Sequence, residues 1–407
     1  MPRGIAARKP VIAGLGLTEL GKVYGRSAAS LAAEAVTRAV EDAGMALADL
    51  DGLLTSNGVS GGVGLGLQGD LGLRELKLLS EMQSFGSTAG AMVQVASMAV
   101  NCGMADAVAC VFADAPLRPG RGAGEVYSAG RRPDRPAGAP PSGWGGLLVS
   151  TGVAGANTMY ALAARRHMLR YGTTEDDLAA VAVAQREWAA RNPLAQMRDP
   201  ITVEDHHNSR WIAEPFRKLD CCLVSNGAVA VVVTSAERAA HLAKPPVHVL
   251  GWAQRHPGYQ MRRDPEFGLV SGAARSGPDA LAMAGVALDE VQVAELYDCY
   301  TYTVIVSLED YGFCAKGEGG AFVSGGGLAR PDERGEARSG RLKLNTGGGQ
   351  LSSYYMWGMT PLSEAVIQVR GEGGDRQVHP HDVALVSGNG GILDHHSTLV
   401  LGSEAAA

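Results

Sequence analysis

The pattern of apolar and polar positions along the chain predicts strands that alternate with helices. An apolar run over residues 10–20 (PVIAGLGLTEL) predicts a buried strand. Residues 27–43 carry apolar side chains at helical spacing, with Ser27 or Ser30 as the candidate cap and Gly44 as the stop. Strands and helices in this order are typical of an α/β fold.

The same pattern returns in the second half of the chain, where residues 246–252 predict another strand. AGMALADLDGL at residues 43–53 resembles AGVALDEVQVAELYD at residues 284–298, an offset of 241 residues (284 minus 43). Both segments place an Ala-Gly helix stop before a Leu, an acidic turn and a strand. So long a period predicts two similar halves, which we place at residues 1–240 and 246–407.

Two further segments belong to the first half. Residues 116–146 are rich in Arg, Pro and Gly, and they predict an insertion that is either disordered or a functional loop covering a site. Residues 155–191 predict two helices, the second of which starts at Thr174 with acidic residues in its first turn.

Composition narrows the class of protein. Of the 407 residues, 46% are hydrophobic, which suffices for one large or two medium domains. The 55 glycines and the low aromatic content of 5% indicate close packing of helices on sheets. The net charge is −6, and no basic cluster is interleaved with aromatic residues, so no nucleic-acid partner is predicted. No apolar run approaches the about 20 residues of a membrane span, and we expect a cytoplasmic protein.

Cysteines and histidines offer few candidates for metal chemistry. No CxxC pair has a matching second pair, so no structural zinc site is expected in this chain. We expect Cys221, Cys222 and Cys299 to be packing residues, and the pair His206-His207 to lie in a solvated turn.

A second histidine pair follows Asp394. Neighbouring residues of a strand point to opposite faces, so at most one of His395 and His396 faces a site. His395 is the candidate.

Three late segments show a family resemblance. They are YDCYT at residues 297–301 with LEDYGFCAKGEGGAF at 308–322, NTGGGQLS at 345–352, and GNGG at 388–391. Together with the duplication they resemble the sterol-carrier-type thiolases over essentially the whole chain. The resemblance implies the five-layer αβαβα thiolase fold and a homodimer formed through the edge of the first-half sheet.

The thiolase nucleophile is missing. In that family a cysteine starts a buried helix ahead of a Gly-x-Ala-Asp turn, which is here residues 103–106. Counting back 17 residues (103 minus 86) reaches Gly86 in SFGSTAG. Ser84, Ser87 and Thr88 are close, but a hydroxyl needs an adjacent base before it attacks a thioester. We therefore expect Gly86 and Ser87 to let an acyl-CoA approach a helix N-terminus.

The other thiolase positions are changed as well. Tyr297 stands where the family has His or Asn, and Tyr355, ten residues beyond Asn345 (355 minus 345), stands where it has His. Gly388 replaces the late cysteine. Two new phenols indicate a changed mechanism, although buried tyrosines with structural hydroxyls are the alternative, and Tyr354 competes with Tyr355 for the position.

This pattern resembles the lipid-transfer-protein-type aldolases that shorten steroid side chains, and residues 208–222 (NSRWIAEPFRKLDCC) support that subgroup. The resemblance implies retro-aldol cleavage of a β-hydroxyacyl-CoA to a ketone and a shorter acyl-CoA such as propionyl-CoA or acetyl-CoA. It also implies catalysis by Tyr297 and Tyr355, and a small partner protein with a zinc ribbon and an OB-fold. No cofactor is then expected in this chain; coenzyme A is part of the substrate, and zinc is expected only in the partner. The extra run at residues 330–341 leaves the substrate's identity open.

A retro-aldol reaction needs a base for the β-hydroxyl proton, donors for the enolate oxygen, and an acid for the α-carbon. We favour Tyr355 as the base. The candidates for binding the substrate or its oxyanion are Gly86, Ser87, Gly348, Gly349, Gly388, Asn389, Gly390 and His395. Two alternatives stay open: a non-catalytic acyl-CoA-binding or lipid-binding subunit of a heteromeric complex, and a divergent thiolase with a displaced nucleophile.

Overall fold

A computed structural model describes residues 8–123, 150–153, 155–258, 265–331 and 341–407. The first half contains β1 (Pro10–Leu17), α1 (Ala28–Ala43), β2 (Gly52–Asn57), α2 (Leu67–Asp70), β3 (Leu78–Glu81), α3 (Thr88–Asn101), β4 (Ala107–Asp114) and β7 (Gly227–Ser235). Between β4 and β7 lie α6 (Ala156–Tyr171), α7 (Glu175–Ala189), α8 (Val203–Asn208), β5 (Trp211–Ala213) and β6 (Phe216–Arg217).

After the short α9 (Ala236–Ala239), the second half repeats the arrangement of the first. It contains β8 (Val247–Arg255), α11 (Ala273–Ala284), β9 (Val293–Glu295), α12 (Thr301–Tyr311), α13 (Gly319–Ser324), β10 (Lys343–Leu344), α14 (Met359–Val369), β11 (Val383–Gly390) and β12 (His395–Gly402). The predicted boundary between the halves falls between β7 and β8.

Sheet topology shows the two halves directly. In the described part of the chain ten strands follow the order β10-β9-β11-β12-β8-β1-β7-β4-β2-β3. In the first half β3, β2 and β4 are parallel while β7 and β1 are antiparallel, and in the second half β10, β9 and β11 are parallel while β12 and β8 are antiparallel. The halves meet where β1 pairs with β8, with Ile12 opposite Val247.

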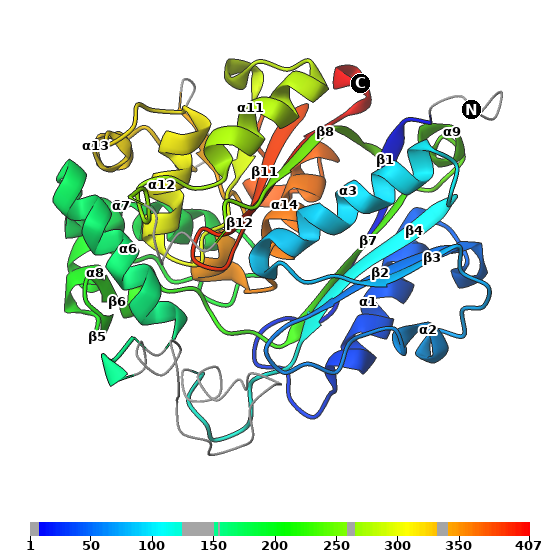
Figure 1. Ribbon diagram of the computed structural model, residues 1–407, viewed down its shortest axis with the longest axis horizontal. Helices are drawn as coiled ribbons and strands as arrows, with labels where there is room; N and C mark the ends of the chain where they lie inside the picture. The colour runs from blue at the N-terminus through cyan, green and yellow to red at the C-terminus, as the bar shows by residue number, and fades with distance from the viewer. Residues whose placement is uncertain (1–7, 124–149, 154, 259–264, 332–340) are drawn as a thin grey trace.

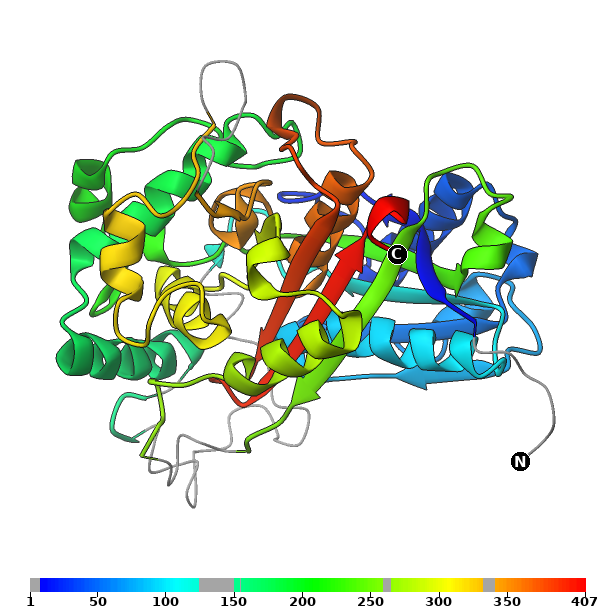
Figure 2. The same ribbon diagram turned by 90° about the horizontal axis from the view of Figure 1, so that it is seen from above.

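Helices complete the layers. α1 covers the outer face of the first half of the sheet, and α11 covers that of the second. α3 and α14 contact strands of both halves and form the middle layer (Figures 1 and 2). Their apolar faces meet in one core that holds Met92 and Val93 of α3 and Leu362 and Val366 of α14. Because the middle layer lies against both halves, the start of α3 is close to the ends of second-half strands.

The repeat extends to the capping of single turns. Gly44 and Gly285, 241 residues apart (285 minus 44), both end their helices in the left-handed region, with φ of 73° and 68°. In the turn after α1, the Ala46 N–H donates to the Asp49 carboxylate at 2.8 Å, and in the turn after α11 the Ala287 N–H donates to Glu290 at 2.7 Å. The same local chemistry therefore leads into β2 and into β9.

The helices predicted within residues 155–191 are present as α6 and α7. Thr174 caps α7, since its side chain accepts from the Asp177 N–H. The solvated turn predicted for the first histidine pair is wrong for His206, which is fully buried at 2.8 Å from Asp220 because helix α8 turns it inward. The predicted loop at residues 116–146 lies largely outside the described residues.

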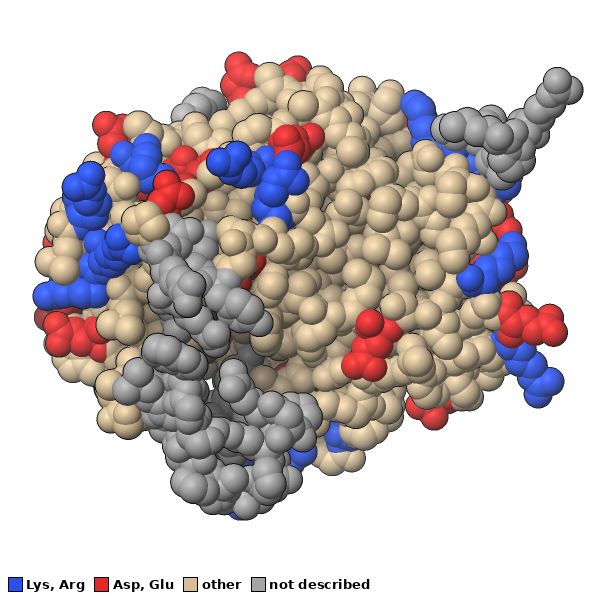
Figure 3. All heavy atoms as spheres, in the orientation of Figure 1, with Lys and Arg blue, Asp and Glu red and all other residues tan. Residues whose placement is uncertain are grey.

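On the face shown in Figure 3, basic side chains lie at the left, at the upper centre and along the right edge, and are interspersed with acidic ones. Among the described helices, none combines the length and the apolar character that crossing a membrane requires.

Candidate active site

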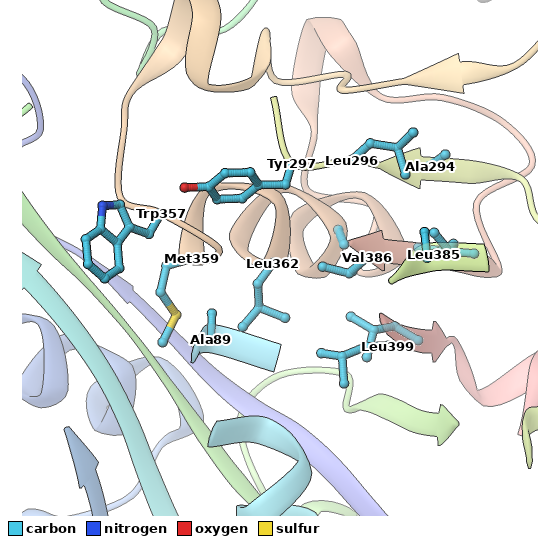
Figure 4. Packing of buried hydrophobic residues seen from close by; sticks show 14 of the residues in the cluster. Ala89, Ala294, Leu296, Tyr297, Trp357, Met359, Leu362, Leu385, Val386 and Leu399 are labelled. Atoms are coloured by element: carbon cyan, nitrogen blue, oxygen red, sulfur yellow. The ribbon is translucent and has the colours of Figure 1, made fainter. Parts of the chain in front are cut away.

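Two tyrosines from distant segments meet beside the start of α3. Tyr297 follows β9, and Tyr355 follows a turn at Gly349–Ser353. Their hydroxyl oxygens lie 3.3 Å apart. The Tyr297 side chain is buried, and its hydroxyl points toward the side where Trp357 lies (Figure 4). Tyr355 is half-buried. The structure thus brings together the two phenols that the sequence singled out.

The neighbouring Tyr354 points elsewhere. Its hydroxyl lies 2.8 Å from the Ser363 hydroxyl of α14, and burial raises the pKa of its phenol. The backbone N–H of Tyr355 donates to the Ser225 hydroxyl at 3.0 Å, which holds the chain after the turn. Tyr355 is therefore the residue that faces Tyr297.

Gly86 lies directly against the Tyr297 ring. A Cβ atom built on Gly86 would lie 2.2 Å from the Tyr297 Cζ and 2.2 Å from the Asn389 carbonyl oxygen. The ring therefore fills the space in which a side chain at position 86 would begin.

Gly388 and Gly390, which the structure places at the end of β11 and not in a loop, approach the backbone of residues 84–87. A Cβ on Gly388 would lie 2.8 Å from the Gly86 carbonyl oxygen, and one on Gly390 would lie 2.0 Å from the Ser84 carbonyl oxygen. Ser87 is buried there, and its carbonyl oxygen accepts from Ser397 at 2.9 Å. Five of the predicted binding residues, Gly86, Ser87, Gly388, Asn389 and Gly390, thus gather at one place, because only glycines allow such close backbone contacts.

The hydroxyls near Gly86 are engaged by the backbone. Ser87 donates to the Ser84 carbonyl oxygen at 3.0 Å, and Thr88 donates to that of Phe85 at 2.7 Å. A serine nucleophile needs a base within hydrogen-bond reach. Among the contacts of the described residues, neither hydroxyl has such a base.

Gly348 and Gly349 shape the turn that leads to Tyr355. Both have positive φ, 91° and 58°. A Cβ on Gly348 would meet Ala189, and one on Gly349 would lie 2.1 Å from the Asp298 carboxylate. The Gly348 N–H donates to the Asn345 carbonyl oxygen at 2.8 Å. These contacts are internal to the fold, so the substrate contact expected of both glycines stays a prediction.

Asp298 ties the two tyrosine-bearing segments together. Its buried carboxylate accepts from the N–H groups of Gln350, at 2.9 Å, and Leu351, at 3.2 Å. Burial raises the pKa of Asp298 to about 7. Asp298 directly follows Tyr297, and its carboxylate accepts hydrogen bonds from the turn before Tyr355. It therefore fixes the position of the two segments relative to each other.

The late histidines point in opposite directions, as predicted. His396 is buried with its Nε2 at 3.0 Å from the Tyr311 hydroxyl and 3.2 Å from that of Ser387, and burial lowers its pKa to about 3. His395 is half-buried, with its Nδ1 3.0 Å from that of His256 and its ring stacked on Phe85. His395 therefore lies at the rim of the site, whereas His396 belongs to the core.

Tyr160 joins the site from α6, and no pattern in the sequence pointed to it. Its hydroxyl donates to the Gly391 carbonyl oxygen at 2.6 Å and accepts from the Asn389 amide at 3.2 Å. Asn389 is buried, and within the described part of the chain its amide oxygen has no hydrogen-bond partner. Tyr160 thus holds residue 391 after β11 in place. It also orients the Asn389 amide, whose oxygen accepts no hydrogen bond among the described residues.

Aromatic rings form one wall of the site. The Trp357 ring lies 4.9 Å from Phe112 and 6.0 Å from Phe85, measured between centroids. Five non-glycine residues in the described ranges have positive φ, and four of them, Phe85, Asn345, Trp357 and Leu393, belong to segments around the site. Strained backbone of this kind gathers at functional sites.

The cysteines near the site are packing residues, as predicted. Cys299 is buried, and burial raises the pKa of its thiol to about 12, so it is not a thiolate at neutral pH. Cys221 and Cys222 also have thiol pKa values raised by burial.

Comparison with known proteins covers the whole chain. Residues 253–403 match the family described as thiolase C-terminal domain-like. The chain is 39% identical over 408 residues to a protein of Thermomonospora curvata named steroid side-chain-cleaving aldolase, with 97% of each covered. It is 39% identical over 390 residues to the 17-hydroxy-3-oxo-4-pregnene-20-carboxyl-CoA lyase of Mycobacterium tuberculosis, with 93% of this chain and 96% of that protein covered.

A solved structure described as the Ltp2-ChsH2(DUF35) aldolase has the same architecture. It superposes with a TM-score of 0.82 at 36% sequence identity, and the match covers 98% of this chain and 99% of that one. Both halves and the insertion between β4 and β7 therefore fall within the similarity.

Proposed function

This chain belongs to the steroid side-chain-cleaving aldolases of the thiolase fold, and from that premise we propose that it cleaves a β-hydroxyacyl-CoA by a retro-aldol reaction. The observation that supports this most is the 3.3 Å contact between the Tyr297 and Tyr355 hydroxyls beside Gly86. The predicted five-layer thiolase architecture is confirmed by the strand order and by the matching structure.

The chemistry follows from what two phenols supply. Tyr355, as the base, takes the proton of the substrate's β-hydroxyl, and the carbon–carbon bond breaks to leave a ketone and the enolate of the shorter thioester. Tyr297, as the acid, protonates the α-carbon. The proton taken and the proton given balance, so the 3.3 Å contact allows the pair to return to its starting state by one transfer between the hydroxyls.

The surroundings suit a reaction without a covalent intermediate. Gly86 lies against the Tyr297 ring, Gly388 and Gly390 pack on the backbone of residues 84–87, and the rings of Phe112 and Trp357 are buried beside them. Electrostatic stabilisation of an enolate is stronger where water is excluded. Of the two phenols, the half-buried Tyr355 is the more accessible, since Tyr297 is buried.

Membership in the family leaves the acyl group of the substrate open. One relative is named for steroid side-chain cleavage and the other for a pregnene carboxyl-CoA, and we propose a steroid side chain as the acyl group, with propionyl-CoA or acetyl-CoA as the shorter product. The purified chain, with and without its partner, would be given a tertiary β-hydroxyacyl-CoA, and the ketone and short acyl-CoA would be followed by mass spectrometry. Formation of neither product under any pairing would refute the proposal.

We also propose that the chain works in an assembly. The Ltp2-ChsH2(DUF35) aldolase is named for two components, which supports a small partner protein for this chain as well. We expect any zinc in the predicted zinc ribbon of that partner rather than in this chain.

The edge strand β3, which among the described strands pairs only with β2, supports a homodimer formed edge to edge. Light scattering of the chain alone and with the partner measures both interactions.

A further inference from the structure

We propose that residue 86 decides which chemistry this site can perform, because the Tyr297 ring and a side chain at position 86 exclude each other. The inference rests on the proposed function in taking Tyr297 as a working phenol. A Cβ on Gly86 would lie 2.2 Å from the Tyr297 Cζ and 2.3 Å from its Cε2, a separation that real Cβ atoms do not show. The backbone at Gly86 does not have positive φ, so an L-residue is excluded there not by conformation but by contact with the ring and with the Asn389 carbonyl oxygen, which lies 2.2 Å from the same Cβ.

Neither partner has room to withdraw. The Gly86 peptide is enclosed on other sides, since a Cβ on Gly358 would lie 2.3 Å from its carbonyl oxygen and one on Gly388 would lie 2.8 Å from it. Tyr297 is only 3% exposed, so its ring has no open solvent into which to turn. A methyl group at position 86 therefore fits only if the Tyr297 phenol and the Asn389 carbonyl are forced from their present positions, which moves the phenol away from Tyr355.

Position 388, near the end of β11, has no room for a side chain either. A Cβ on Gly388 would lie 2.5 Å from the Ser397 Oγ and 3.0 Å from the Ser87 Cα. A nucleophile at position 86 is thus excluded while Tyr297 keeps its place, and an acid or base at position 388 is excluded by Ser397 and by the backbone of residues 86 and 87. It follows that restoring thiol side chains alone does not restore acyl transfer, and that the ring at position 297 has to leave first.

A double-mutant cycle on stability tests the contact without relying on turnover. In the wild-type background, Gly86→Ala lowers the unfolding midpoint and reduces kcat/KM on the order of 100-fold, as expected when a reacting group is displaced by about 1 Å. In a Tyr297→Ala background the same Gly86→Ala change lowers the midpoint by less, because the contact with the ring is gone and only the one with the Asn389 carbonyl oxygen remains. Gly69→Ala, at a helical glycine with open space around it, leaves midpoint and activity unchanged.

The outcomes separate the two proposals. Equal midpoint shifts from Gly86→Ala in both backgrounds overturn the exclusion, as does a Gly86→Ala variant with full stability and activity. If Gly86→Ala does not fold, recovery of folding in the Gly86→Ala/Tyr297→Ala double variant supports the exclusion, and no recovery overturns it. A wild-type protein without aldolase activity would instead count against the proposed function. The double-mutant cycle would still test the exclusion, because it is measured on stability and not on turnover.

A second arm uses acetyl-CoA and the Gly86→Cys substitution. In acyl transfer the introduced thiol attacks the thioester carbonyl carbon, the bond to the coenzyme A sulfur breaks, and coenzyme A leaves as its thiol while the acetyl group stays on the protein. We expect that acetyl adduct in intact-protein mass spectra for Gly86→Cys/Tyr297→Ala and not for Gly86→Cys alone. An adduct of equal yield on the single variant overturns the inference.

Discussion

The hydroxyl oxygens of Tyr297 and Tyr355 lie 3.3 Å apart, although 58 positions separate the two residues in the chain. Tyr297 reaches this place from the end of a second-half strand, and Tyr355 from the turn before α14. In the proposed mechanism this contact makes the two phenols a proton-transferring pair, and the first two of the following predictions rest on it.

Replacing Tyr355 with phenylalanine removes one member of the pair and leaves the ring. We expect kcat/KM to fall by about 10²–10⁴-fold, the usual contribution of a positioned acid or base, with little change in the unfolding midpoint. Tyr354→Phe is the matched control: it breaks the 2.8 Å contact with Ser363 and costs about 1 kcal/mol of stability, but it leaves turnover intact. Steady-state assays and urea unfolding of both variants test this prediction. A larger loss of turnover in Tyr354→Phe than in Tyr355→Phe would contradict the assignment of Tyr355 as the base.

Replacing Asp298 with asparagine weakens the link between the two tyrosine segments. An amide presents one acceptor where the carboxylate presents two to the Gln350 and Leu351 N–H groups, so we expect a loss of about 1–3 kcal/mol in the free energy of unfolding. We also expect kcat to fall more than the affinity for substrate, because Tyr355 shifts while the rest of the pocket stays. Unchanged kcat in a destabilised Asp298→Asn variant would show that the link is purely structural.

Tyr160→Phe tests the anchor of the last loop. The variant loses the bond to the Gly391 carbonyl oxygen and leaves the Asn389 amide without its acceptor, and we expect a reduction of about tenfold in kcat/KM besides a loss of about 1 kcal/mol in stability. Tyr302→Phe is the control, since its hydroxyl also donates to a backbone carbonyl, that of Gly268, at 2.6 Å. Similar activity losses in the two variants would argue against a role for Tyr160 at the site.

Because His396 is buried in its neutral form, we expect the free energy of unfolding to depend on pH. Burial lowers its pKa to about 3, below the ordinary value of 6.5, so the unfolded chain binds a proton between these values that the native protein does not. The contribution is complete above pH 6.5 and is lost as the pH falls toward 3, by about 2 kcal/mol between pH 7 and pH 5. Urea unfolding at several pH values measures this slope, which should become shallower in His396→Gln; an unchanged slope in that variant would place its origin elsewhere.

Much of the fold was predictable from the chain because its determinants are local. The apolar spacing of α1, its glycine stop at Gly44 and the copy of both 241 residues later (285 minus 44) are set by helix geometry and left-handed caps within single turns. The loss of the thiolase cysteine at Gly86 and the gain of Tyr297 and Tyr355 were also visible, since each is a residue at a counted position.

Only the tertiary structure decided which groups meet. Tyr354 and Tyr355 have the same side chain and adjacent positions, and an irregular turn without periodicity decides that one enters the core while the other faces Tyr297. His206 is buried because it forms a contact with the Asp220 carboxylate. Tyr160 joins the site because its hydroxyl, on α6, donates to the Gly391 carbonyl oxygen. The ring over Gly86 likewise depends on contacts between segments far apart in the chain, and no local pattern encodes such packing. The sequence by itself determined the elements and the residues available for chemistry, whereas their long-range packing determined the arrangement of the site.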